Sequence, residues 1–322
     1  MNLLQRLKID PFLMWILLMV LSATLFPAQG AAAVFFKQLT TAAISLLFFM
    51  HGAKLSREAV LSGIWHWRLH SLVLLTTFVL FPLIGLAVSQ LPASLLPPEI
   101  AQGFLYLSAL PATVQSAIAF TSVARGNIAA AVCSAALSSL LGIFLSPLLV
   151  GLLVSAHGST ELWPSVQAVM LQLLLPFVLG HLARPLIGNW VARHKKLIKT
   201  TDQSSILLVV YTAFSAAVLE GIWQKVSLPD LLAIAVLSCL MLAAVLFFTT
   251  YSARRLGFSK EDEITIVFCG SKKSLANGIP MANIMFPAAT VGTLVLPLML
   301  FHQIQLMVCA VLAQRYAARQ DK

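Results

Sequence analysis

The chain has 322 residues, of which 59% are hydrophobic and only 10% are charged. Soluble domains carry about a quarter charged residues, so this composition excludes an ordinary soluble protein and indicates a polytopic helical membrane protein embedded in a lipid bilayer. The net charge of +10 does not indicate a nucleic-acid partner, because the basic residues lie in short loops between apolar stretches. The four cysteines fall within those stretches without metal-ligand spacing, so we expect neither a disulfide framework nor a metal site.

Ten apolar stretches have the length of transmembrane helices. They lie near residues 11–28, 32–53, 69–90, 100–122, 128–155, 164–184, 204–223, 230–251, 264–286 and 288–314. With the N-terminus placed inside, most of the 21 lysines and arginines fall in inner segments, as the positive-inside rule requires. We therefore expect a multi-pass protein with both termini in the cytoplasm. The compact chain without a targeting extension favours a bacterial inner membrane.

The order of the spans indicates an internal duplication. The basic loop 184–199 divides the chain into two sets of five spans, 11–155 and 164–314, and an odd number per set makes the repeats inverted. The fourth span of each set is interrupted by polar residues. The expected fold is therefore all-α, with ten transmembrane helices in two inverted five-helix repeats that form one transporter domain, residues 1–322. Corresponding broken helices indicate the binding site in such folds.

Span four is expected to break at its proline. Pro111 removes a backbone donor and disfavours helix at Leu110. Thr113, Gln115 and Ser116 follow at once and offer oxygens to an ion or substrate. An ordinary proline kink is the alternative interpretation, but the matching break five spans later favours a binding site.

Span nine is the stretch that indicates a site most directly. Its sequence ITIVFCGSKKSLANGIPMANIMF stops being an apolar helix at residues 270–274 and then resumes. Lys272 and Lys273 lie about 13 Å deep at ~1.5 Å per residue, and charges at that depth mark a substrate or ion path. Adjacent helical side chains point about 100° apart, so we expect at most one lysine to face the site and favour Lys272. The neighbouring candidate residues are Ser271, Ser274 and Asn277.

No acidic residue is predicted near the middle of the membrane, so the lysines lack the usual partner. Three alternatives stay open for the buried lysine. It is paired with carbonyls at a helix C-terminus, partly deprotonated by desolvation, or neutralised by an anionic ligand. The third alternative is a physical reason to expect an anionic substrate.

Two further polar groups lie inside apolar spans. His302 and Gln303 interrupt span ten, although a buried histidine is more often a satisfied hydrogen-bonding group than a proton carrier. Ser134 and Ser138 in span five are candidate site oxygens, although together with Gly142 they are also typical of small-residue helix packing.

These residues give the chain a resemblance to a known family. LPATVQSAIAFTSVARGN in span four, EITIVFCGSKKSLANGIPM in span nine and FFMHGAKLS after span two resemble the bile acid:sodium symporter family over nearly the whole length. The lysine-containing form is most similar to the branch of the seventh vertebrate member and its bacterial relatives. The resemblance implies core and panel domains, with two broken helices that cross at sodium sites beside a cavity for an amphipathic organic anion.

The resemblance also implies that most sodium ligands are replaced. The positions that hold them in sodium-coupled relatives are Gln115 and Ser116, Phe268, Lys272, Thr77, Ala131 and Ala135 in this chain. Our hypothesis is that the Lys272 ammonium occupies a former sodium position, so that transport is sodium-independent or depends on lysine protonation.

We therefore expect a secondary transporter that moves a small organic anion by alternating access. A cation/proton antiporter is the alternative, disfavoured by the missing intramembrane carboxylate, and a non-transporting regulator on the same scaffold is another. An enzyme is not expected, because the sequence has no HExxH motif, paired intramembrane aspartates or suggestive Ser/His pair. No cofactor is expected. Two candidates for the coupling ion stay open: a sodium ion, despite the replaced ligands, and a proton.

Overall fold

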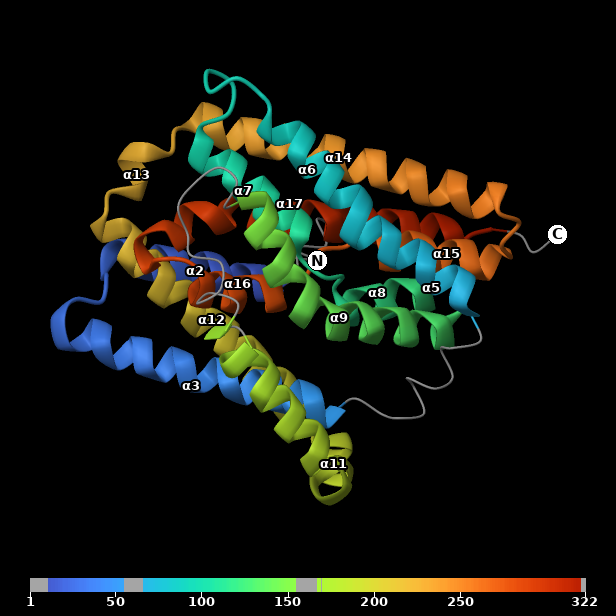
Figure 1. Cartoon of the computed structure of the whole chain (residues 1–322), viewed down its shortest axis with the longest axis horizontal. Coiled ribbons are helices and arrows are strands. Elements are labelled where there is room, and N and C mark those ends of the chain that lie inside the picture. Colours follow the sequence, from blue (N-terminus) through green and yellow to red (C-terminus); the bar gives the residue numbers. More distant parts are fainter. Residues whose placement is uncertain (1–10, 55–65, 155–166, 169, 320–322) are drawn as a thin grey trace, which may run out of the picture. The chain divides into compact units, whose positions relative to one another are not determined.

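The computed structural model describes residues 11–54, 66–154, 167, 168 and 170–319, and every regular element in them is helical (Figure 1). The all-α prediction is confirmed. In chain order the elements are α2 (Pro11–Leu25), α3 (Gly30–Lys54), α5 (Trp67–Leu75), η2 (Thr76–Leu80), α6 (Phe81–Ser89), α7 (Pro98–Ala109), α8 (Val114–Val123), α9 (Ile128–Val154), η4 (Met170–Leu174), α11 (Leu175–Arg193), α12 (Lys195–Leu219), α13 (Ile222–Lys225), α14 (Leu228–Arg255), α15 (Lys260–Gly270), α16 (Leu275–Met285) and α17 (Ala288–Ala317).

Seven helical stretches in this part of the chain are long and apolar enough to cross a membrane. The pair α7 and α8, bent by 64°, raises that number to eight. The remaining two predicted spans correspond to α2, which is shorter, and to α15 and α16, which are separated by a break. The count of ten spans and the inverted repeat therefore stay predictions. The predicted span ends at 155 and 164–166, and the last two residues of FFMHGAKLS, lie outside the described residues.

The described helices form two compact units, and each unit takes segments from both halves of the sequence. The first unit holds α2, α3, η4, α11, α12, α13, nearly all of α16 and the first turns of α17. The second holds α5, η2, α6, α7, α8, α9, α14, α15 and the remainder of α17. The candidate site is described within the second unit, because both helix breaks belong to it.

In the first unit, α3 and α11 pack with their backbones in contact (Figure 1). Gly52 lies against the Phe177 carbonyl, and Gly180 lies against the Phe49 carbonyl, so neither position has room for a Cβ atom. A hydrogen bond of 2.6 Å from Lys54 Nζ to the buried Asp202 carboxylate joins α3 to α12. Small residues and a buried polar pair thus fix the helices of this unit, as in other membrane bundles.

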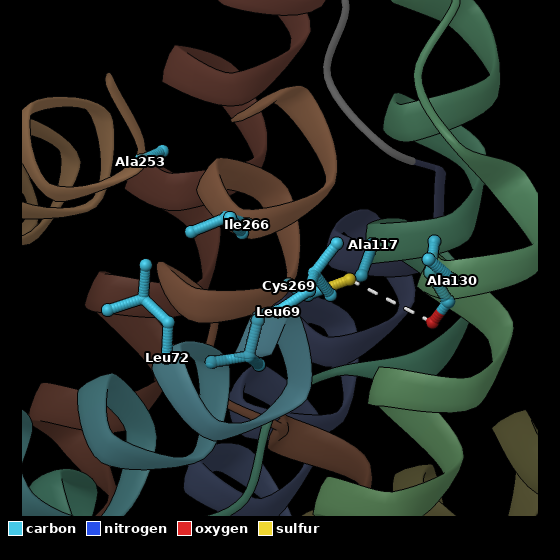
Figure 2. Close-up of a cluster of buried hydrophobic side chains, with 9 residues drawn as sticks. Leu69, Leu72, Ala117, Ala130, Ala253, Ile266 and Cys269 are labelled. Carbon is cyan, nitrogen blue, oxygen red and sulfur yellow. Dashed lines mark hydrogen bonds between the residues drawn. The ribbon is translucent and has the colours of Figure 1, made fainter. Parts of the chain in front are cut away.

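The core of the second unit is built on small side chains (Figure 2). Alanines from α8, α9 and α14 lie beside leucines of α5 and beside Ile266 and Cys269 of α15. The Cys269 thiol contacts the Ala131 carbonyl of α9 at 3.8 Å. Because these alanines occupy little volume, α15 lies close to α5, α8 and α9, and its C-terminal end is held at the site.

The opposite end of α15 is anchored by polar contacts. Ser259 caps the helix by accepting a hydrogen bond from the Asp262 N–H at 3.2 Å. The nearly buried Glu263 carboxylate accepts hydrogen bonds from Arg254 and Lys260 and from the Tyr316 hydroxyl. These bonds join α14, α15 and α17 at one end of the unit, so the position of α15 along its axis is fixed.

Candidate functional site

Span four breaks where its proline predicts. α7 ends at Ala109, Leu110 takes an extended ψ of 155°, and α8 begins at Val114. The extended conformation follows from Pro111, whose ring disfavours helix at the preceding residue. The Ala112 N–H, which the interrupted helix leaves without its usual acceptor, donates to the Ser138 hydroxyl of α9 at 3.0 Å. We call residues 110–113 break 1.

Gly142 of α9 makes room for break 1. An added Cβ at Gly142 would lie 2.5 Å from the Pro111 Cβ, well inside van der Waals contact. The predicted role of Ser138 and Gly142 in close helix packing therefore fits the structure, and Ser138 has a polar function in addition. Ser134, one turn earlier, instead makes a hydrogen bond of 2.6 Å with the buried His70.

Span nine also breaks where predicted, since α15 ends at Gly270 and α16 begins at Leu275. We call residues 271–274 break 2. The two breaks bond directly to each other. The Ser274 N–H donates to the Pro111 carbonyl at 2.9 Å, and the Thr113 hydroxyl donates to the Lys273 carbonyl at 2.7 Å. Each break thus satisfies backbone groups that the other leaves free, and we call their meeting point the junction.

The side chain of Gln305 in α17 forms hydrogen bonds with the main chain of break 2. Its side-chain carbonyl accepts the Lys273 N–H at 2.9 Å, and its amide nitrogen donates to the Lys273 carbonyl at 3.0 Å. His302, one turn earlier, lies 2.8 Å from the same amide nitrogen and 3.2 Å from the Lys273 carbonyl. One fully buried glutamine therefore satisfies both main-chain groups of a non-helical residue, as a neighbouring β-strand would.

The Lys273 side chain ends among backbone carbonyl oxygens. Its Nζ donates to the oxygens of Ser108 and Leu110 at 2.7 Å each and to that of Thr77 at 2.8 Å. The Phe81 ring covers the group, with its centroid 4.2 Å from Nζ. We call these three oxygens and the ring the cage. Three acceptors match the three N–H bonds of an ammonium group.

Each cage oxygen is free for a local reason. Ser108 and Leu110 lie at the C-terminal end of α7, where the last carbonyls have no helical donor and carry partial negative charge. In η2 the Phe81 N–H bonds to Thr76, five residues back. The same pattern would pair Thr77 with residue 82, which is Pro82 and has no N–H. Two prolines, Pro82 and Pro111, therefore create the cage.

Lys272 points to a different environment from Lys273. Its side chain is also fully buried, but its Nζ has no oxygen or nitrogen partner among the described residues. It lies 4.3 Å from the centroid of Phe120 and 5.8 Å from that of Phe268, and the Cys309 thiol, a weak acceptor, is near it. The structure thus places Lys273 rather than Lys272 at the junction and buries both.

The other candidate residues are distributed around the junction or away from it. Thr77 contributes its carbonyl, while its hydroxyl bonds back to Val73. The hydroxyls of Ser116 and Ser271 are buried and have no partner among the described residues. Gln115 is exposed, Gln303 is half-buried with no bond to the junction in the described part of the chain, and Asn277 is buried in the first unit.

Gln305 belongs to the candidate site by its bonds to Lys273 but is not among the residues that the sequence indicates. A signal was present, because residues three apart share one face of a helix and Gln305 follows His302 by three positions. Gln303 is adjacent to His302 and therefore points about 100° away from it. The aromatic rings over the two lysines, Phe81 and Phe120, carried no signal that distinguishes them from ordinary apolar residues of a span.

Comparison with known proteins supports the same class of molecule. The "Putative symporter YfeH" of Escherichia coli is 63% identical over 98% of this chain and 95% of its own length. "Sodium/bile acid cotransporter 7-A" of Xenopus laevis is 29% identical over 97% of this chain and 93% of its own, and the rat cotransporter 7 is 28% identical over 97% and 94%. A family model covers residues 10–318. With apolar helices interrupted at a polar junction, this multi-pass membrane protein belongs to the SBF-like CPA transporter family.

Proposed function

We propose that the chain is a secondary transporter that moves a small organic anion by alternating access and does not require sodium. The observation that carries the proposal is the pair of fully buried lysines at break 2, neither of which pairs with a carboxylate in the described part of the chain. An intramembrane cation is costly unless it has a partner or a function. One relative is named "Putative symporter YfeH" and another "Sodium/bile acid cotransporter 7-A", which supports a transported small molecule.

Lys272 is the residue that we assign to the anion. Its ammonium has no oxygen or nitrogen acceptor among the described residues, so an anionic group of the substrate would neutralise it. Two buried hydroxyls near the breaks, those of Ser116 and Ser271, likewise have no partner in the described part of the chain and can donate to such a group. Charge-assisted hydrogen bonds of this kind are about twice as strong as neutral ones.

The proposal that transport does not require sodium rests on Lys273. Its ammonium already bonds to the carbonyl oxygens at the junction, which is where the resemblance implies a sodium site. The ten-helix inverted-repeat fold with core and panel domains, the bacterial inner membrane and the cytoplasmic position of both termini belong to the same proposal. We expect no enzymatic reaction and no cofactor, with a proton as the remaining candidate for a coupling ion.

The test is uptake of labelled anions into liposomes that contain the purified protein. The probes are taurocholate, chosen because of the names of the relatives, together with octanoate and benzoate as smaller anions. Wild-type uptake of at least one probe should be equal in sodium and potassium, and Lys272→Gln should reduce it about ten- to hundredfold, the effect of one charge-assisted hydrogen bond.

Three results would contradict the proposal. Uptake that requires sodium would overturn the proposal that transport is independent of sodium. A Lys272→Gln variant that transports as well as wild type across a pH series would overturn the role of Lys272. Proton movement driven by a sodium or potassium gradient, without uptake of any anion, would favour the cation/proton antiporter.

A further inference from the structure

The cage around Lys273 has the composition of a cation site. Its three hydrogen-bonding ligands are backbone oxygens at 2.7–2.8 Å from Nζ, contributed by η2 and by the end of α7. The face of the Phe81 ring, at 4.2 Å, adds a fourth favourable contact. Rings of backbone carbonyls replace the hydration shell of monovalent cations in channel filters, so these ligands suit a cation without any carboxylate.

The cage does not depend on the lysine for its existence. The carbonyls of Ser108 and Leu110 are free because α7 ends before Pro111, and that of Thr77 is free because Pro82 has no N–H. Removing the Lys273 side chain would therefore leave three buried oxygens directed at one point. Such groups are costly to bury without a donor.

We propose that the cage is a monovalent-cation site, selective for primary ammonium groups, which the chain fills with its own Lys273 side chain. Tethering gives the lysine a high effective concentration, so a free ion in solution does not displace it. This inference rests on the proposed sodium-independent transport. It goes further by stating that the Lys273 ammonium occupies the position of the ion. It also predicts that a free primary amine will bind once the tether is removed.

Lys273→Ala tests this by chemical rescue. Alanine keeps Cβ and removes three methylene groups and the ammonium, which n-propylammonium replaces in number and charge. We expect n-propylammonium to raise the unfolding temperature of Lys273→Ala by about 2–4 °C at roughly ten times its dissociation constant. Methylammonium should stabilise less, because it restores the charge and donors but leaves more of the cavity empty.

Four comparisons distinguish binding in the cage from non-specific stabilisation by the added compounds. Wild type should gain nothing from the amine, because Lys273 occupies the cage. Lys272→Ala is the matched control, since Lys272 is as buried but its Nζ contacts no carbonyl oxygen among the described residues, and it should also gain nothing. Tetramethylammonium tests the need for N–H donors, and 1-propanol tests the need for charge. Neither should stabilise Lys273→Ala.

The rescue experiment has two results that would overturn the proposal. If n-propylammonium stabilises Lys273→Ala no more than 1-propanol does, or stabilises Lys272→Ala equally, the cage is not a cation site. If Lys273→Ala is not recovered folded, the fraction of monodisperse protein after extraction in n-propylammonium or tetramethylammonium is compared instead, and equal fractions overturn the proposal. Because the readout is folding, a failed rescue leaves anion transport untouched, and failed anion uptake leaves the cage untouched.

Discussion

Lys273→Met is expected to lower the free energy of unfolding by about 3–9 kcal/mol, because three buried carbonyl oxygens lose their donor at about 1–3 kcal/mol each. Lys272→Met is expected to change it by about 1 kcal/mol or less. Methionine keeps the contacts with Phe120 and Phe268, and the removed amine has no oxygen or nitrogen partner among the described residues. Two adjacent lysines of equal burial are thus expected to contribute very differently to stability.

Thermal unfolding followed with a thiol-reactive fluorogenic dye measures this difference. Cys133, Cys269 and Cys309 are buried free thiols in the second unit and become reactive on unfolding. The exposed Cys239 is first replaced by serine in all variants so that it gives no background signal. Equal losses in the two methionine variants, or a larger loss in Lys272→Met, would contradict the assignment of the junction to Lys273.

Gln305→Leu is expected to lower the free energy of unfolding by about 2–4 kcal/mol, since the buried N–H and carbonyl of Lys273 both lose a partner. It should also reduce anion uptake, because break 2 loses the side chain that fixes its main chain. Gln303→Leu is the matched control, with the same change of side chain two positions away, and should have an effect below about 0.5 kcal/mol.

The same dye assay and the liposome assay check the Gln305 prediction. A loss in Gln303→Leu as large as in Gln305→Leu would contradict it, because the effect would then follow from apolar substitution in α17 and not from the bonds to Lys273. Gln305→Glu adds a finer comparison. A carboxylate retains the acceptor for the Lys273 N–H but removes the donor to the Lys273 carbonyl, so an intermediate loss is expected.

The helical character of the chain and both helix breaks could be predicted from the sequence, because they depend on local chemistry. Pro111 disfavours helix at Leu110 wherever it occurs, and a run of glycine, serine and lysine does not continue an apolar helix. The structure confirms both positions, with α7 ending at Ala109 and α15 ending at Gly270. Family membership could also be read from these segments, and the family model confirms it.

The orientation of the two lysines could not be predicted in the same way. The expectation that at most one lysine faces the site depends on helical geometry, in which adjacent side chains point about 100° apart. Residues 271–274 are not helical, so their side-chain directions follow from the bonds of break 2 to Pro111, Thr113 and Gln305. Those are long-range contacts that the sequence does not display.

Thr77 contributes to the cage by its main chain. The resemblance indicates residue 77 as a sodium-ligand position that is replaced in this chain. In the structure the hydroxyl bonds within its own helix, while the carbonyl oxygen bonds to Lys273. The reason is Pro82, whose missing N–H frees that carbonyl in the π-helical stretch. A proline is visible in the sequence, but the π-helical register that connects it to residue 77 is not.

The division into units is a property of packing rather than of chain order. Each unit combines segments from before and after the basic loop 184–199. The predicted inverted repeats, residues 11–155 and 164–314, divide the chain differently from these units and stay a prediction.

The central claim is that the Lys273 ammonium, and not a bound sodium ion, occupies the junction. The most direct test is the unfolding temperature of the wild-type protein in increasing sodium chloride or potassium chloride at matched ionic strength. An ion that binds only the folded protein must raise that temperature with the logarithm of its concentration. We predict identical curves in the two salts; a rise specific to sodium would show that the folded protein binds this ion and would contradict this account.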